Sequence, residues 1–267
     1  MHQCYESAAQ NGPMSAKELA IGQNPALKQD VAVPEAKVRA AIELLRNAVQ
    51  EHGKVVYSNS LGAESMVLTD LIWTHVPQIE IFSIDTGRLH EETYQLLERI
   101  ERRYQRRIRL YYPDPASLEA YTAENGINGF YNGLAERQSC CHIRKVEPFR
   151  RAIKDAGAWV TGVRAEQSAT RAQVKAVEFD ASNDLYKISP ILDWTNDEVW
   201  AYIRANKLPY NPLHDRGFPS IGCAPCTRAV EPGADSRSGR WWWENADSKE
   251  CGLQPRIRIV ASAKAPA

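Results

Sequence analysis

Two pairs of cysteines, far apart in the sequence, most constrain how this chain can fold. The first pair is adjacent, Cys140 and Cys141, and the second, Cys223 and Cys226, has C-x-x-C spacing. Four thiolates in two close pairs suit a tetrahedral metal ion or an iron–sulfur cluster. Adjacent side chains diverge by about 100° on a helix, so they would crowd one zinc ion but could reach two corners of a cubane. Zinc and iron–sulfur both stay open, and the adjacent pair favours the cluster.

Two simpler interpretations of these cysteines compete with a metal site. An adjacent pair also fits two small buried apolar side chains. Disulfides are disfavoured, because nothing in the sequence suggests an oxidising compartment.

Composition narrows the class of protein. Hydrophobic residues make up 43% of the 267 positions, enough for one large α/β domain or two small ones. The 33 basic and 33 acidic residues balance, so no overall basic field is available to bind nucleic acid. No apolar run approaches a membrane span and the N-terminus has no apolar signal region. We therefore expect a soluble, cytoplasmic protein with no nucleic-acid or membrane partner.

Short apolar runs alternate with helical periodicity along the middle of the chain. Strands are predicted at residues 54–57, 79–84, 108–112, 159–161 and 185–188. Helical patterns occupy residues 38–49, 66–72, 91–104, 117–124 and 147–156. Gly53 is expected to end the first helix, and Thr195 with Glu198 forms a capping box that opens a last one. This alternation predicts an α/β fold with a doubly wound, mostly parallel sheet.

Two loops at strand ends are candidates for binding an anion. Residues 58–65 and 85–88 both follow strands, where parallel sheets bind their ligands. A small-residue loop that begins a helix presents free backbone N–H groups to an anion. The first loop has neither a Walker nor a Rossmann glycine pattern, and alone it is more typical of helix capping. The substrate-binding candidates in these loops are Ser58, Ser60, Gly62, Asp85 and Thr86.

A third loop, residues 162–171, follows the predicted strand at 159–161. Its Arg164 and Arg171 have the planar guanidinium groups that suit phosphate or sulfate oxygens. Surface solubility is the ordinary explanation for a single arginine, but the position of this loop at a strand end favours anion binding.

The C-terminal part differs in composition from the rest. Residues 227–250 contain glycines, charges and the run Trp241–Trp243, with Arg237 and Arg240 just before it. We expect a lid over the mouth of the sheet, with the tryptophans as packing anchors. The resulting division is an N-terminal arm at 1–34, a nucleotide-binding α/β domain with the cysteine site at 35–226, and a lid and tail at 227–267.

One further cysteine, Cys251, precedes a glycine and is sterically open. It needs positive surroundings to ionise. Glu250 opposes ionisation, whereas Arg237 and Arg240 could favour it if the tail folds back. Alone, this cysteine is a weak candidate for a nucleophile.

Together these motifs closely resemble those of the assimilatory adenylyl-sulfate reductases, within the wider phosphoadenylyl-sulfate reductase family. The resemblance covers roughly residues 35–253 and implies a sheet of the adenine-nucleotide alpha-hydrolase-like (PP-loop) type. It rests on residues 85–93, Cys140 and Cys141 with 143–145, 162–171, 210–214, Cys223 and Cys226, 237–241 and 250–253.

The resemblance implies adenylyl sulfate as the substrate and a [4Fe-4S] cluster on Cys140, Cys141, Cys223 and Cys226. It also implies that the Cys251 thiolate attacks the sulfate sulfur, that AMP leaves, and that an S-sulfocysteine remains. A thiol of reduced thioredoxin, or of a glutaredoxin-like donor, would then release sulfite for cysteine biosynthesis. No other cysteine is near Cys251 in sequence, which suits an external thiol. The candidates for holding the sulfate and screening like charges are Lys145, Arg164, Arg171, Arg237 and Arg240.

Two positions depart from the family pattern. Gln254 stands where the family usually has histidine, and Ser65 stands where it often has aspartate. Glutamine forms hydrogen bonds but cannot carry charge or transfer a proton, which bears on how Cys251 is tuned. The tail after Leu253 matches nothing in the family pattern.

Other functions remain open at this level. The substrate could instead be 3′-phosphoadenylyl sulfate, or both nucleotides could be used. An adenylating PP-loop enzyme is a more distant alternative that would leave Cys251 without a role. A zinc-stabilised binding module without catalysis is another, and a homo-oligomer is left open.

Overall fold

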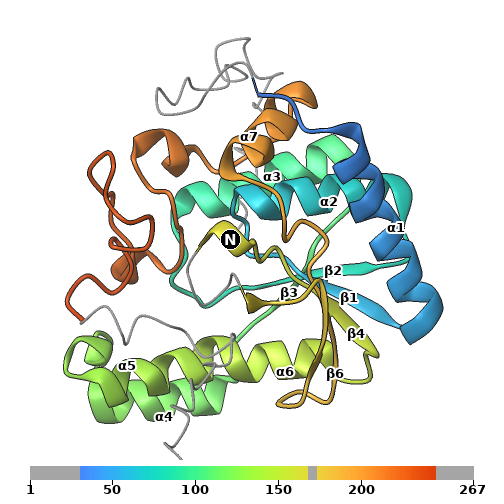
Figure 1. Cartoon of the computed structure of the whole chain (residues 1–267). Coiled ribbons are helices and arrows are strands. Elements are labelled where there is room, and N and C mark those ends of the chain that lie inside the picture. The colour runs from blue at the N-terminus through green and yellow to red at the C-terminus, as the bar shows by residue number, and fades with distance from the viewer. Residues whose placement is uncertain (1–30, 168–172, 245–267) are drawn as a thin grey trace, which may run out of the picture.

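A six-stranded sheet forms the centre of the fold, with strand order β3-β2-β1-β4-β6-β5 (Figure 1). The computed structural model describes residues 31–167 and 173–244. The strands are β1 (Val55–Ser58), β2 (Glu80–Ile84), β3 (Arg109–Tyr111), β4 (Ala158–Val160), β5 (Val177–Asp180) and β6 (Leu185–Ile188). All neighbours pair in parallel except β5, which is antiparallel to β6. The predicted doubly wound, mostly parallel sheet is confirmed.

Helices cover both faces of this sheet (Figure 1). The helices are α1 (Glu35–His52), α2 (Ala63–His75), α3 (Glu91–Tyr104), α4 (Pro115–Asn125), α5 (Leu134–Cys141), α6 (Glu147–Ile153) and α7 (Asn196–Ala205). Successive strand residues point to opposite faces. Tyr57 accordingly packs in the core with α1, α2, α3 and α7, whereas Val56 packs against Phe149 of α6.

Local signals in the sequence account for several element ends. Gly53 adopts a φ of +67° and donates its N–H to Val49 O, which ends α1 as expected. Both hydrogen bonds of the capping box between Thr195 and Glu198 are present at the start of α7. The helix expected to reach residue 156 ends at Ile153, and Asp155 just beyond it has a φ of +63°.

Two elements were not predicted. β5 is a four-residue edge strand whose apolar Val177 and Phe179 are exposed while Asp180 is buried, so its apolar residues do not mark a buried face. α5 ends at the adjacent cysteines and continues into a π-helical turn, His142–Val146, before α6. Among the described residues, no helix is both long and apolar enough to cross a membrane.

The strand order locates a switch point at β1. The chain proceeds from β1 outward to β2 and β3, and then returns to the other side of β1 as β4. In open α/β sheets of this kind, ligands bind in the crevice beyond the carboxyl ends of the strands at the switch point. The loops that follow β1 and β4 therefore border the expected ligand site.

Candidate functional site

The loop after β1 is a tight turn held by its own side chains. Leu61 adopts a φ of +60° although it is not glycine, which costs about 1–2 kcal/mol. Its N–H donates to Asn59 Oδ1 at 2.7 Å. The N–H of Ser60 donates to Ser65 Oγ at 3.1 Å, and the two hydroxyl oxygens lie 2.9 Å apart. Ser60 is exposed and Ser58 half-buried at the switch point, and backbone strain of this kind is typical of ligand-binding loops.

The loop after β4 packs directly against the first turn of α2, which follows Gly62. A Cβ atom on Gly162 would lie 3.2 Å from Glu64 Cβ, so a larger residue there would require Glu64 to shift. Arg164, two residues on, is buried and bonded to Glu64 and Glu166. Its predicted role as an anion ligand stays a prediction, and Arg171 lies outside the described residues.

The loop after β2 is ordered by Asp85. One oxygen of this carboxylate, Oδ1, accepts hydrogen bonds from the Gly87 N–H at 2.8 Å and from the Tyr94 hydroxyl at 3.0 Å. Asp85 and Thr86 are both buried. Thr86 Oγ1 lies 3.3 Å from Cys223 Sγ, and the Ala224 N–H donates to Arg88 O at 2.7 Å. This loop therefore contacts the segment that contains the second cysteine pair.

Folding brings the two cysteine pairs together. Cys140 and Cys141 at the end of α5, and Cys223 and Cys226 around the short turn Ala224–Cys226, are all buried in one cluster with Trp241. All four are free cysteines, with no disulfide between them. Within residues 31–167 and 173–244, no group of three or more histidine, cysteine or acidic side chains is arranged to hold a metal ion.

Positive side chains border the cysteine cluster. Lys145 is buried, and its Nζ lies 5.6 Å from the centre of the Trp241 ring. Arg240 is also buried, with its Cζ 4.7 Å from the same ring. Arg144 donates from Nη1 to Thr86 O at 2.6 Å. Two of the predicted binding residues, Lys145 and Arg240, thus lie beside the cysteines.

These charges act unequally on the thiols. Burial raises the pKa of the Cys226 thiol to about 12, and neighbouring Cys223 adds to the shift. Burial also raises the pKa of Cys140, as does Cys141. Burial opposes ionisation of Cys223 as well, but Lys145, Thr86 and Arg240 outweigh it and hold that thiol's pKa below its ordinary value.

The segment after the second cysteine pair folds back over it, on the same side of the molecule as α5 (Figure 1). Thr227 and Arg240 form an antiparallel bridge, and the Trp241 N–H donates to Cys226 O at 3.1 Å. The Trp241 side chain has 0% exposure. Its indole Nε1 has no hydrogen-bond partner among the described residues. This packing agrees with the expected anchoring role of the tryptophans.

Other predicted residues are less constrained. Arg237 is half-buried in a turn where its backbone N–H donates to Asp235 Oδ1 at 2.8 Å. Cys251, the proposed nucleophile, and Gln254 lie outside the described residues.

Sequence reasoning missed Arg144 and Trp241 as members of the site. Arg144 comes four residues after Cys140, and Lys145 four after Cys141, a spacing that puts side chains on one face of a helix. That spacing was a usable signal for Arg144. The position of Trp241 depends on the return of the chain to Thr227, which no local pattern indicates.

Comparison with known proteins finds a matching family, similar sequences and a similar solved structure. The family described as phosphoadenosine phosphosulfate reductase domain matches residues 54–229. Adenosine 5′-phosphosulfate reductase of Allochromatium vinosum is 54% identical over 217 residues, which cover 81% of this chain and 85% of that protein. The protein of the same name from Burkholderia cepacia is 51% identical over 218 residues, covering 82% and 87%. The crystal structure of phosphoadenylyl-sulfate reductase from Candida auris, a phosphate complex, matches with a TM-score of 0.61 and 26% identity over 75% of this chain and 99% of that one.

Proposed function

Because the chain belongs to the phosphoadenosine phosphosulfate reductase family, we propose that it reduces adenylyl sulfate to sulfite and AMP in sulfate assimilation. The convergence of four buried cysteines at the carboxyl end of the sheet carries this proposal. It is supported by relatives, half or more identical over most of the chain, that are named adenosine 5′-phosphosulfate reductase.

The proposed cofactor is a [4Fe-4S] cluster on Cys140, Cys141, Cys223 and Cys226. Two observations fit this cofactor. The donors are four buried thiols, and the indole N–H of Trp241, which belongs to the same buried cluster, has no hydrogen-bond partner among the described residues. Lys145, Arg144 and Arg240 supply positive charge where thiolates would be negative. When bound, the cluster would supply the iron that keeps these thiolates ionised and cross-links the segments that carry them.

The proposed nucleophile is Cys251. Its thiolate forms an S–S bond with the sulfate sulfur while the bond from that sulfur to the phosphate oxygen breaks, and AMP takes the electron pair. The enzyme then carries an S-sulfocysteine. A thiolate of reduced thioredoxin attacks Cys251 Sγ, sulfite leaves with the electron pair, and the second thioredoxin thiol closes a disulfide. Thioredoxin is thereby oxidised, and Cys251 is regenerated.

Binding of the nucleotide is assigned to the loops at the switch point. We expect the end of the Ser58–Gly62 loop to face the phosphate side, because it leads into the N-terminus of α2, whereas the N–H groups of Ser60 and Leu61 already donate within the loop. Lys145, Arg171, Arg237 and Arg240 are the cations proposed to screen the sulfate from the attacking thiolate. Screening of like charges by fixed cations is a large term in reactions of this type.

A second candidate substrate is 3′-phosphoadenylyl sulfate. The observation in its favour is the match in fold to the Candida auris enzyme of that name, although its identity to this chain is far lower than that of the adenosine 5′-phosphosulfate reductases. Sulfite release from each nucleotide, with reduced thioredoxin, separates the two. We expect release from adenylyl sulfate. Release from neither nucleotide by iron-loaded protein would overturn the proposed function.

A further inference from the structure

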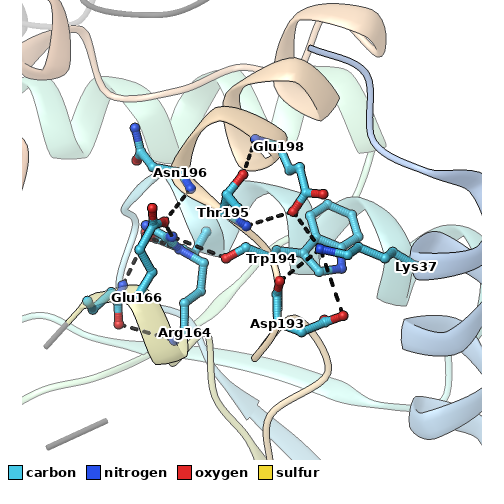
Figure 2. A network of polar contacts seen from close by, with 10 residues as sticks. Lys37, Arg164, Glu166, Asp193, Trp194, Thr195, Asn196 and Glu198 are labelled. Carbon is cyan, nitrogen blue, oxygen red and sulfur yellow. Dashed lines mark hydrogen bonds and ion pairs between the residues drawn. The ribbon is translucent and has the colours of Figure 1, made fainter. Parts of the chain in front are cut away.

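Arg164 is an arginine whose charge is already compensated inside the protein. Its exposure is only 5%. Nε and Nη2 both lie 3.0 Å from Glu64 Oε1. Nη1 donates to Glu166 Oε2 at 2.8 Å and to the carbonyl oxygen of Trp194 at 3.3 Å (Figure 2). Each of the three guanidinium nitrogens therefore has a partner.

The charges around Arg164 make it a poor site for an anion. Glu64 and Glu166 bring two negative charges to one positive group, so the cluster is formally negative before any ligand arrives. A phosphate would have to displace a carboxylate from a guanidinium that is almost inaccessible to water. Charge-assisted hydrogen bonds in such surroundings are strong, and breaking one partner away leaves a buried charge uncompensated.

The partners of Arg164 come from three separate segments. Glu64 lies in the first turn of α2, directly after the Ser58–Gly62 loop. Glu166 belongs to the loop after β4, and its Oε2 also accepts the N–H of Asn196, the first residue of α7, at 2.7 Å. Gln167 Nε2 donates to Glu64 Oε1 at 3.0 Å, which adds a second tie between the two loops. Arg164 thus joins both loops of the switch point to the start of α7.

The start of α7 is itself held from the other side. Lys37 of α1 donates from Nζ to Glu198 Oε2 at 2.9 Å and to Asp193 O at 2.8 Å (Figure 2). Glu198 in turn accepts the Thr195 N–H at 2.7 Å. The start of α7, to which Glu166 ties Arg164, is therefore held in place by α1 as well. The contacts of Arg164 thus connect both loops to a part of the fold that is itself fixed.

We infer that Arg164 is a positioning residue, which locks the loops after β1 and β4 in register through Glu64 and Glu166 and does not itself bind the anion. This inference rests on the proposed function, because it takes those loops to bind an adenosine nucleotide. It reassigns a residue that the sequence pattern alone would give to the phosphate or sulfate.

Equilibrium binding of three ligands tests the assignment. Dissociation constants of adenosine, AMP and adenylyl sulfate are measured for the iron-loaded wild-type protein and for Arg164→Lys, with the exposed Arg39→Lys as the matched control. A positioning role predicts that Arg164→Lys weakens all three by a similar factor, roughly ten- to a hundredfold. A direct anion ligand predicts losses for AMP and adenylyl sulfate with adenosine unchanged, and that result would overturn the inference. If the wild-type protein binds none of the three, the proposed function fails, and this inference with it.

Removing the charge of Glu64 or Glu166 is a second test, in which the two possible roles of Arg164 predict opposite changes in AMP binding. If Glu64 and Glu166 merely held back an anion-binding arginine, Glu64→Gln or Glu166→Gln would free it and tighten AMP relative to adenosine. A positioning role predicts weaker binding of all three ligands. Thermal melts accompany each variant: a lower Tm with unchanged dissociation constants well below it would mean a purely structural role and would also overturn the inference. Because Glu166→Gln keeps the shape of a largely exposed side chain, it remains informative if Arg164→Lys fails to fold.

Discussion

Cys223 lies against Thr86, with Sγ 3.3 Å from Oγ1, although 137 positions separate the two residues in the chain. Thr86 belongs to the loop after β2 and Cys223 opens the C-x-x-C turn. Their contact, together with the hydrogen bond from Ala224 to Arg88 O, joins the cysteine cluster to a strand-end loop. The proposed cluster and the proposed nucleotide site are therefore parts of one packed region.

Iron content tests the cysteine cluster. Replacing any one of Cys140, Cys141, Cys223 or Cys226 by serine should lower iron, inorganic sulfide and sulfite release, because a hydroxyl is a poor substitute for a thiolate ligand. The measurement is metal and sulfide analysis of anaerobically purified protein, which should be brown. Cys4, which lies in the N-terminal arm and outside the motifs above, provides the control, since Cys4→Ser should leave iron, sulfide and sulfite release unchanged. A colourless, zinc-loaded and fully active wild-type protein would rule the cluster out.

Replacing single arginines tests whether they bind the phosphate or sulfate of the substrate. Arg171→Ala, Arg237→Ala and Arg240→Ala should each lower kcat/KM for adenylyl sulfate by roughly ten- to a hundredfold, since a lost charged hydrogen bond is worth about 1.5–3 kcal/mol. Steady-state sulfite release provides the measurement. Arg39→Ala, on the exposed face of α1, serves as the control. Wild-type kinetics in all three variants would show that these arginines do not bind the substrate.

The role of Cys251 separates chemistry from binding. Cys251→Ser should keep its iron and still bind adenylyl sulfate, yet release no sulfite, because a serine hydroxyl without a base is a far weaker nucleophile. Wild-type protein mixed with substrate but no thioredoxin should gain the mass of one SO3 on the peptide that contains Cys251. Reduced thioredoxin should remove it. An adduct on a different cysteine would contradict the mechanism.

His214 should make stability depend on pH. Burial lowers the pKa of this imidazole below its ordinary value of 6.5, although the charge of Glu64 opposes the shift. The folded protein therefore binds fewer protons than the unfolded chain, and stability is lost as pH falls below 6.5. Tm should drop more steeply between about pH 7 and pH 5.5 for wild type than for His214→Gln, before most carboxylates titrate near pH 4. The half-buried His90 provides the control, since His90→Gln should flatten the profile less. Equal slopes in all three proteins would contradict this assignment.

Local patterns predicted most of the sheet and its loops but not the contacts between them. The capping box at Thr195 and the cap at Gly53 depend on neighbouring residues, so the sequence alone indicates them. The exposed strand β5 escaped detection because its partner β6, rather than a buried face, holds it in place. The pairing of Arg164 with Glu64 spans 100 positions, and such long-range ion pairs leave no periodic trace.

The wide turn at His142–Val146 has a consequence for how this chain can vary. It lies between α5 and α6 without a break, so the adjacent cysteines, Arg144, Lys145 and the helix packed on the sheet share one continuous rod. A π-helical turn holds an extra residue within its winding. Deleting one residue there would return the turn to ordinary α-helical winding, whereas deleting one from the regular winding of α6 would rotate the cysteines by about 100° relative to the side chains beyond the deletion. Side-chain changes at the exposed His142 would also leave that phase intact, so the wide turn is expected to tolerate changes of identity and of one residue in length, whereas α6 is not expected to tolerate a change of length.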